Sequence, residues 1–188
     1  MKMGISALRS FLKDPQYQAD PETSFSHRLR TCVQLLVWAL GLGILLAIVL
    51  GILESLGPWD LDQHAFEALL KEYPVPVILA LLVVVAPVLE ETIFRAPLWF
   101  FRDSQYFKEA FYVSALLFGA VHLSNFPNFS EIWYLAVFLI SPQVVLGLFL
   151  GYIRVRFGLA WAMAFHSAYN GILAGPFLLL LVLNAPIS

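Results

Sequence analysis

Charged residues are scarce in this chain. Aspartate, glutamate, lysine and arginine make up 13% of its 188 residues, against about a quarter in soluble domains. Hydrophobic residues make up 60%, and the mean hydropathy is +0.79. Both departures indicate an integral membrane protein. The net charge of −2 is too small to favour a nucleic acid or another polyanion as a partner.

Cysteine is nearly absent, and the common catalytic motifs are missing. The single cysteine, Cys32, allows no internal disulfide and no CxxC metal pair. The chain contains no HExxH helix, no GxSxG turn, no P-loop and no dinucleotide-binding fingerprint. No aspartate lies inside an apolar run, which excludes a paired-aspartate site in the membrane. The first thirty residues hold no apolar core of signal-peptide type, so we expect the N-terminus to be retained.

What the chain has in abundance is long apolar runs. A membrane span needs about 20 mostly apolar residues. The runs predict an all-α fold, a polytopic membrane helical bundle of about five to six transmembrane helices. We expect a cytoplasmic N-terminal tail at 1–31 and one transmembrane helical domain at 32–188. The expected spans are 33–53, 74–101, a short one at 110–123, 132–153 with a kink at Pro142, and 157–183, which a break at Gly175–Pro176 would divide.

The basic residues predict how these spans are oriented. Leaving out Arg95, nine lysines and arginines fall on the side of the N-terminus and one, Lys71, on the other. By the positive-inside rule the N-terminus is cytoplasmic. The largest connection, 54–73, is rich in acidic residues and has a weak amphipathic pattern. It is either an interfacial helix or an ordinary loop.

Five ionisable residues nevertheless lie within the apolar runs: Glu90, Glu91, Arg95, His122 and His166. Charge at this depth is costly, so such residues indicate a functional site. Counted from the nearest basic residue at 1.5 Å per residue, Glu90, His122 and His166 lie about 18, 21 and 15 Å deep. The middle of the hydrocarbon core is about 15 Å deep. The three side chains are therefore expected to form one polar site near the midplane.

Helical spacing separates the three charges of the second run. Glu91 and Arg95 are four residues apart, share one face and can form an ion pair. Glu90 lies about 100° further round the helix and faces elsewhere. Pro87 cannot donate a backbone N–H, so we expect a kink just before Glu90.

The histidines have neighbours at the same spacing. His166 shares a face with Asn170, and Phe118 shares one with His122. Taken singly, each pair can be a structural contact between helices, and Glu91–Arg95 can be a buried structural pair. Taken together, a glutamate and two histidines can activate water, directly or through a metal. Two histidines and one glutamate also match the ligands of a catalytic zinc with one open position.

The order of these residues resembles a known family. "EETIFR" (90–95), "FGAVH" (118–122) and "HSAYN" (166–170) match the patterns EExxxR, FxxxH and HxxxN. The chain is similar over about 77–175 to the intramembrane proteases of the CAAX protease and bacteriocin-processing family (CPBP, or Abi). The resemblance implies an intramembrane endopeptidase in which Glu90 and His122 activate the attacking water.

The resemblance also implies the other roles. His166 and Asn170 would stabilise the oxyanion, and Glu91, Arg95 and Phe118 would support the site, with Arg95 structural or bound to a substrate carboxylate. The cofactor stays open. A divalent metal such as Zn²⁺, if present, would be held by Glu90, His122 and His166.

The expected partners are the lipid bilayer and a membrane protein or lipidated peptide as substrate, with the CAAX type among the alternatives. The expected location is the plasma membrane of a prokaryote. Two other functions stay open. One is a non-catalytic interaction, immunity or scaffold protein of the same family, and the weaker one is a proton or ion pathway.

Overall fold

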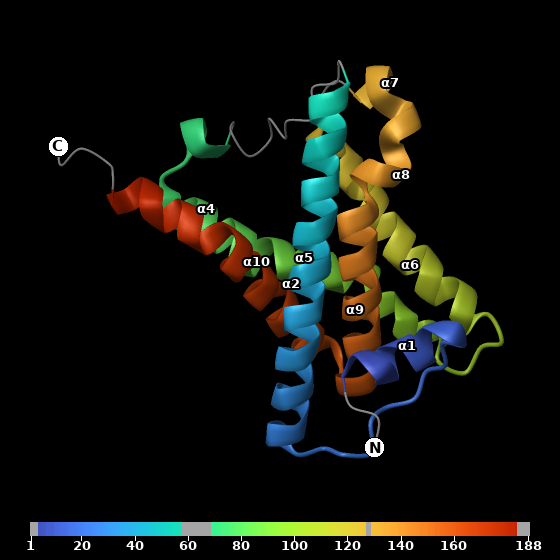
Figure 1. The fold of residues 1–188 in the computed structure, drawn as a ribbon. Coiled ribbons are helices and arrows are strands. Elements are labelled where there is room, and N and C mark those ends of the chain that lie inside the picture. Colours follow the sequence, from blue (N-terminus) through green and yellow to red (C-terminus); the bar gives the residue numbers. More distant parts are fainter. Residues whose placement is uncertain (1–3, 58–68, 127–128, 184–188) are drawn as a thin grey trace.

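The structure is an all-α membrane protein, as predicted. The computed structural model describes residues 4–57, 69–126 and 129–183, and this part of the chain contains no strand (Figure 1). Three helical segments are long and apolar enough to cross a membrane: Phe25–Leu56, Val75–Phe101 and Leu159–Leu181. A fourth span results if the bent pair Phe129–Leu139 and Ser141–Phe157 is counted as one.

The chain order of the elements is as follows. The α-helices are α1 (Ile5–Lys13), α2 (Phe25–Leu56), α4 (Val75–Ala80), α5 (Ala86–Phe94), α6 (Phe107–Val121), α7 (Phe129–Ile132), α8 (Ala136–Leu139), α9 (Ser141–Phe157) and α10 (Leu159–Leu183). A π-helical segment, η1 (Leu81–Val85), joins α4 to α5, and the 3₁₀ segments are η2 (Ala96–Phe101), η3 (His122–Asn125) and η4 (Trp133–Leu135). The predicted short span at 110–123 corresponds to α6, whose 15 residues are fewer than a bilayer usually requires.

Helix α9 is the centre of the bundle. Helices α2, α6 and α10 all pack against it. Gly147 and Gly151 form a GxxxG pattern on α9, which lets neighbouring helices approach closely. A Cβ at Gly147 would lie 3.3 Å from the Cα of Ala115, and one at Gly151 would lie 2.6 Å from the ring of Phe111, so both contacts with α6 depend on glycine.

Two expectations about prolines have different outcomes. The kink at Pro142 is confirmed, since α8 ends at Leu139, Pro142 lies in the first turn of α9, and the two parts meet at 43°. The break at Gly175–Pro176 is wrong, because α10 continues through Pro176. A proline removes one helical hydrogen bond, and membrane helices tolerate that loss. The chain instead turns at Gly158, whose φ of 99° favours glycine.

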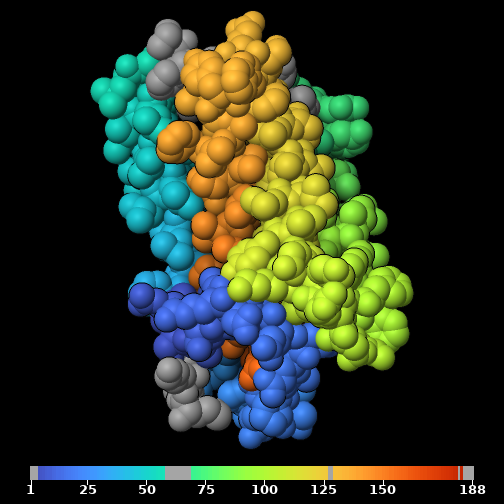
Figure 2. Space-filling view, turned by 90° about the vertical axis from the view of Figure 1, so that its right-hand side faces the viewer, coloured from blue at the N-terminus to red at the C-terminus, as the bar shows by residue number. Residues whose placement is uncertain are grey.

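The N-terminal segment, expected as a tail, contains a packed helix. Leu8 of α1 is buried in the same core cluster as Leu35 of α2 and Ile153 of α9. Figure 2 shows this segment in blue, lying across the lower end of the bundle. The spacing of Ile5, Leu8 and Phe11 gives α1 its apolar face.

The same end of the bundle gathers the elements that carry most basic residues. The start of α2, the start of α6 and the end of α9 lie there beside α1 (Figure 1). The expected interfacial helix or loop at 54–73 lies mostly outside the described residues, which resume as helix at 69–72.

Candidate active site

The first part of the site is the segment that carries Glu90, Glu91 and Arg95. The kink expected at Pro87 is replaced by the π segment η1, which lies just before it. Pro87 is the second residue of α5, which follows η1 without a break. The irregularity that the sequence predicted is therefore present as a widened turn, and α4, η1, α5 and η2 together form one candidate span.

The predicted ion pair of this segment is confirmed. Arg95 Nε lies 3.7 Å from Glu91 Oε2, and both residues are fully buried. The Arg95 guanidinium also lies 4.0 Å from the centre of the Phe118 ring, a cation–π contact. Its nitrogens make no hydrogen bond within the described part of the chain.

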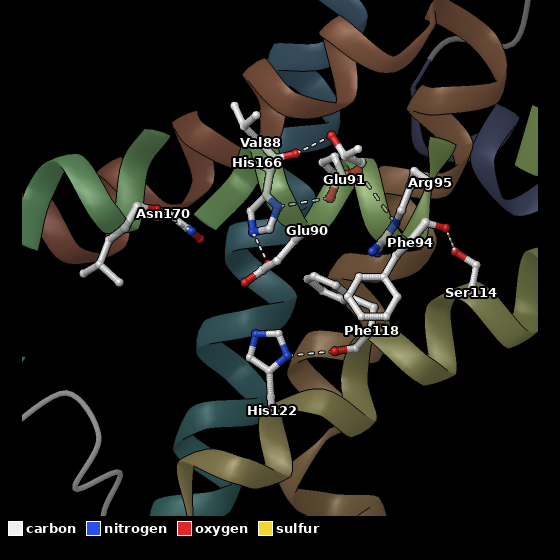
Figure 3. Close-up of polar contacts among 12 residues, drawn as sticks. Val88, Glu90, Glu91, Phe94, Arg95, Ser114, Phe118, His122, His166 and Asn170 are labelled. Carbon is white, nitrogen blue, oxygen red and sulfur yellow. Dashed lines mark hydrogen bonds and ion pairs between the residues drawn. The ribbon is translucent and has the colours of Figure 1, made fainter. Parts of the chain in front are cut away.

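His166 joins this buried pair to Glu90. Its Nδ1 lies 3.1 Å from Glu91 Oε1, and its Nε2 lies 3.7 Å from Glu90 Oε2. The ring is 2% exposed, whereas the Glu90 side chain is 27% exposed. Figure 3 shows the ring of His166 between the two carboxylates. Arg95, Glu91, His166 and Glu90 thus form one row from the packed interior outward, a contact between α5 and α10 that helical spacing could not reveal.

His122 lies at the end of α6, close to the end of the span expected at 110–123. It is the first residue of η3, and its backbone N–H bonds to Gly119 and Ala120 in a tightened turn. The Phe118 carbonyl therefore lacks its regular donor, and His122 Nδ1 lies 2.7 Å from it. The Phe118 ring lies 5.0 Å from the His122 ring, as predicted, and 5.6 Å from that of His166.

Asn170 lies one turn after His166 on α10, as its spacing predicted. Its Nδ2 donates a hydrogen bond of 2.9 Å to the carbonyl oxygen of Leu82, in the π segment. This contact ties the histidine helix to the segment that precedes Glu90.

One cavity of about 610 Å³ brings the predicted catalytic residues together. Glu90, His122, His166 and Asn170 all line it, so three separate segments contribute to one space (Figure 3). No ion pair joins His122 to Glu90 within the residues that the structure describes. The rest of the wall is mostly apolar, with α2 and α9 on further sides. Polar wall residues that sequence reasoning missed are Ser124, Asn125, Gln143 and Tyr169.

Glu91 and Arg95 do not line this cavity. A role for Arg95 in binding a substrate carboxylate does not fit its full burial beneath Phe118. Glu91 instead contacts His166 Nδ1, and Arg95 pairs with Glu91.

Comparison with known proteins agrees with this arrangement. A family model described as type II CAAX prenyl endopeptidase, Rce1-like, matches residues 72–172. The match covers more than half of the chain and all three motifs. The chain belongs to this Rce1-like family. The resemblance to CPBP proteases is thereby confirmed. Searches of curated proteins and of solved structures gave no match.

Membership in the Rce1-like family supports a general function. The family is one of CAAX-type intramembrane endopeptidases, which implies a peptidase with a membrane-associated peptide as substrate in a lipid bilayer. The apolar helices agree with an integral membrane protein.

The metal expected as one alternative needs Glu90, His122 and His166 to converge on one ion. Glu90 and His166 are neighbours, whereas no ion pair joins His122 to either of them among the described residues. The bond of His122 Nδ1 to the Phe118 carbonyl leaves its Nε2 as the nitrogen available to a ligand. Among the described residues, no three side chains of histidine, cysteine, aspartate or glutamate are arranged to hold a metal ion. The three predicted ligands line one cavity, but in this arrangement they are not gathered closely enough to hold one ion.

Proposed function

We propose that this protein is an intramembrane endopeptidase that hydrolyses a peptide bond of a membrane-associated protein or peptide. The observation that carries the proposal is the convergence of Glu90, His122, His166 and Asn170 on one cavity. A non-catalytic scaffold or immunity protein would not need this convergence, since each polar group could be satisfied separately. CAAX-type substrates are the class to test first, because the family model is described by them.

Glu90 and His122 activate the attacking water in this proposal. The Glu90 carboxylate is accessible from the cavity and accepts a proton from the water, while the oxygen attacks the carbonyl carbon of the scissile bond. With His122 Nδ1–H donated to the Phe118 carbonyl, Nε2 is the acceptor that orients the water. The proton then passes to the leaving amine nitrogen as the C–N bond breaks.

His166 and Asn170 stabilise the negative charge that develops on the carbonyl oxygen. Nδ1 of His166 is bound to Glu91, so its Nε2 is the nitrogen directed to the cavity side. The role as an oxyanion donor requires a hydrogen on each ring nitrogen, one donated to Glu91 and one to the oxyanion. Asn170 contributes the second donor through its amide. Donors fixed before the reaction stabilise a transition state without reorganisation.

Glu91, Arg95 and Phe118 support the site in this proposal. Glu91 fixes the His166 ring, Arg95 balances the charge of Glu91, and the Phe118 ring packs against both histidines. The proposed orientation has a cytoplasmic N-terminus by the positive-inside rule, and the proposed location is the plasma membrane.

The test uses the purified protein in liposomes with two probes: a fluorescent peptide ending in a farnesylated CAAX sequence, and the same peptide without the lipid. We expect cleavage of at least one probe, with the products identified by mass spectrometry, and loss of cleavage in His122→Ala. The mechanism uses no metal, so activity should survive dialysis against a strong chelator. Activity that is lost on chelation and restored by Zn²⁺ would contradict this part. Binding of both probes without any cleavage would favour the scaffold function.

A further inference from the structure

The carbonyl of Leu82 has no donor within its own helical segment. In an α-helix its donor would be the N–H of Ala86, but that N–H bonds to Leu81 in the π register. The next N–H along the chain would belong to residue 87, and Pro87 has none. The first donor is therefore engaged elsewhere, and the second does not exist.

Asn170, on another helix, supplies the missing donor to the Leu82 carbonyl. Its Nδ2 donates to the Leu82 carbonyl at 2.9 Å, across 88 positions of sequence. An unsatisfied carbonyl within a membrane protein costs several kcal/mol, so the bond holds the two segments in one register. Leu82 and Asn170 both line the cavity, and His166 lies one helical turn before Asn170.

The consequence for the Asn170 amide follows from its two N–H groups. One is bound to Leu82, so rotation of the amide is restricted. The amide is planar, so the second N–H of Asn170 also has a fixed direction, and Asn170 lines the cavity. An oxyanion donor needs this kind of fixed direction.

His122 shows the same device a second time. The tightened end of α6 takes away the regular donor of the Phe118 carbonyl, and the His122 ring binds that carbonyl instead. Two side chains of the cavity are thus oriented by backbone carbonyls released at helix irregularities.

We infer that Pro87 and the π segment form a positioning device: they release the Leu82 carbonyl, which orients the Asn170 amide in the cavity. Pro87 is a positioning residue that acts through Leu82 and Asn170. The catalytic part of this inference rests on the proposed function, whereas the structural part does not.

The experiment is a double-mutant cycle of Pro87→Ala and Asn170→Ala. An alanine at position 87 restores an N–H, so the Leu82 carbonyl gains a backbone donor from residue 87 in the π register or from Ala86 in the α register. Thermal unfolding in detergent is measured for all four proteins without substrate. We expect Asn170→Ala to lower the midpoint in the natural background, and to lower it by less than half as much in the Pro87→Ala background. The volume lost at the buried Pro87 is common to both Pro87→Ala proteins and cancels.

Cleavage kinetics give the second measurement. Pro87→Ala provides a competing donor for Leu82 and frees the Asn170 amide, so kcat should fall by about 10–100-fold with KM nearly unchanged. Asn170→Ala should cost less stability in the Pro87→Ala background than in the natural one, but the double variant should regain no kcat. Pro97→Ala, at an exposed proline of η2 away from the cavity, is the control and should change neither value.

Equal stability losses for Asn170→Ala in the two backgrounds would overturn the inference, because Leu82 would then not depend on Asn170 for its donor. An unchanged kcat in Pro87→Ala would overturn its catalytic part. If no protein of the set cleaves either probe, the proposed function fails, and the stability cycle still decides the link between Pro87, Leu82 and Asn170.

Discussion

Two polar regions of this molecule use their hydrogen bonds differently. At the lower end of α9, each arginine binds two partners from other segments: Arg154 binds the Arg95 carbonyl and the Tyr17 hydroxyl, and Arg156 binds the Gln18 carbonyl and Asp20. In the cavity, His122 and Asn170 each have one bond to a backbone carbonyl and otherwise face the open space.

The difference separates support from chemistry. In the arginine region, side chains of α9 bind residues 17–20 and so hold the N-terminal segment against this helix. The cavity groups are fixed through one atom and accessible through another, which is the arrangement that a reacting site needs. Substitutions should therefore cost stability in the first region and activity in the second.

Glu90→Gln should give the largest loss of activity with the least change in stability. The change keeps the size of the side chain and removes the proton acceptor, so we expect kcat to fall by about 10²–10⁴-fold. Stability should hardly change, because the Glu90 side chain is 27% exposed and has one long contact, to His166. Probe cleavage in liposomes and thermal unfolding in detergent measure the two effects. Glu109→Gln makes the same chemical change at an exposed position of α6 and should alter neither. Retained cleavage in Glu90→Gln would exclude Glu90 as the base.

Glu91→Leu tests the adjacent residue, on the buried side of the row. It leaves the fully buried Arg95 without its counter-charge, and breaking a buried pair costs about 3–5 kcal/mol. We expect a large fall in the unfolding midpoint. A second change, Arg95→Met, should recover much of the stability. Cleavage should stay low in the double variant, because His166 has lost the partner of its Nδ1. If Glu91→Leu alone is as stable as the natural protein, the pair contributes nothing to folding.

Much of this arrangement could be predicted from local patterns in the sequence. Spacing by four residues identified the Glu91–Arg95 pair and the contact of Phe118 with His122, because a helix brings such positions onto one face. The order of the three motifs identified the family. Long apolar runs identified the helical spans.

The rest depends on contacts between segments far apart in the chain. The bond of His166 to Glu91 spans 75 positions and that of Asn170 to Leu82 spans 88, and no local period reports on either. Pro87 indicated an irregular helix, but its missing N–H can be accommodated by a kink or by a π segment, so sequence alone could not choose between them. The docking of α1 was missed because its apolar face is confined to one helix of nine residues within a polar stretch.

Gly43→Ala tests the packing of the cavity wall and should have an effect of intermediate size. A Cβ at Gly43 of α2 would overlap the hydroxyl oxygen of Tyr169, which is buried and also lines the cavity. We expect displacement of Tyr169, a loss of about 1–3 kcal/mol, and a severalfold lower kcat. Gly41→Ala is the matched control, since nothing lies within 4 Å of its new Cβ. That change should be neutral or stabilise the helix by up to about 1 kcal/mol. Equal effects of the two alanines would show that the contact between Gly43 and Tyr169 is unimportant.

The smallest expected effect lies in the arginine region, and it depends on pH. Burial raises the pKa of Asp20, but the backbone N–H of Glu22 and the charge of Arg156 more than offset this, so the pKa of Asp20 is lowered from its ordinary value of 3.8. A carboxyl with a lowered pKa stabilises the fold above its ordinary pKa and loses that contribution as the pH falls through the lowered value. The unfolding midpoint of the natural protein should therefore fall more steeply below about pH 4 than that of Asp20→Asn. At neutral pH the variant should lose about 1 kcal/mol or less, because the pair with Arg156 is partly exposed.

Asp103→Asn, in an ion pair whose aspartate is 87% exposed, should leave the pH profile unchanged. Cleavage should be normal in both variants, and a loss of kcat in Asp20→Asn would show that the arginine region is coupled to the site.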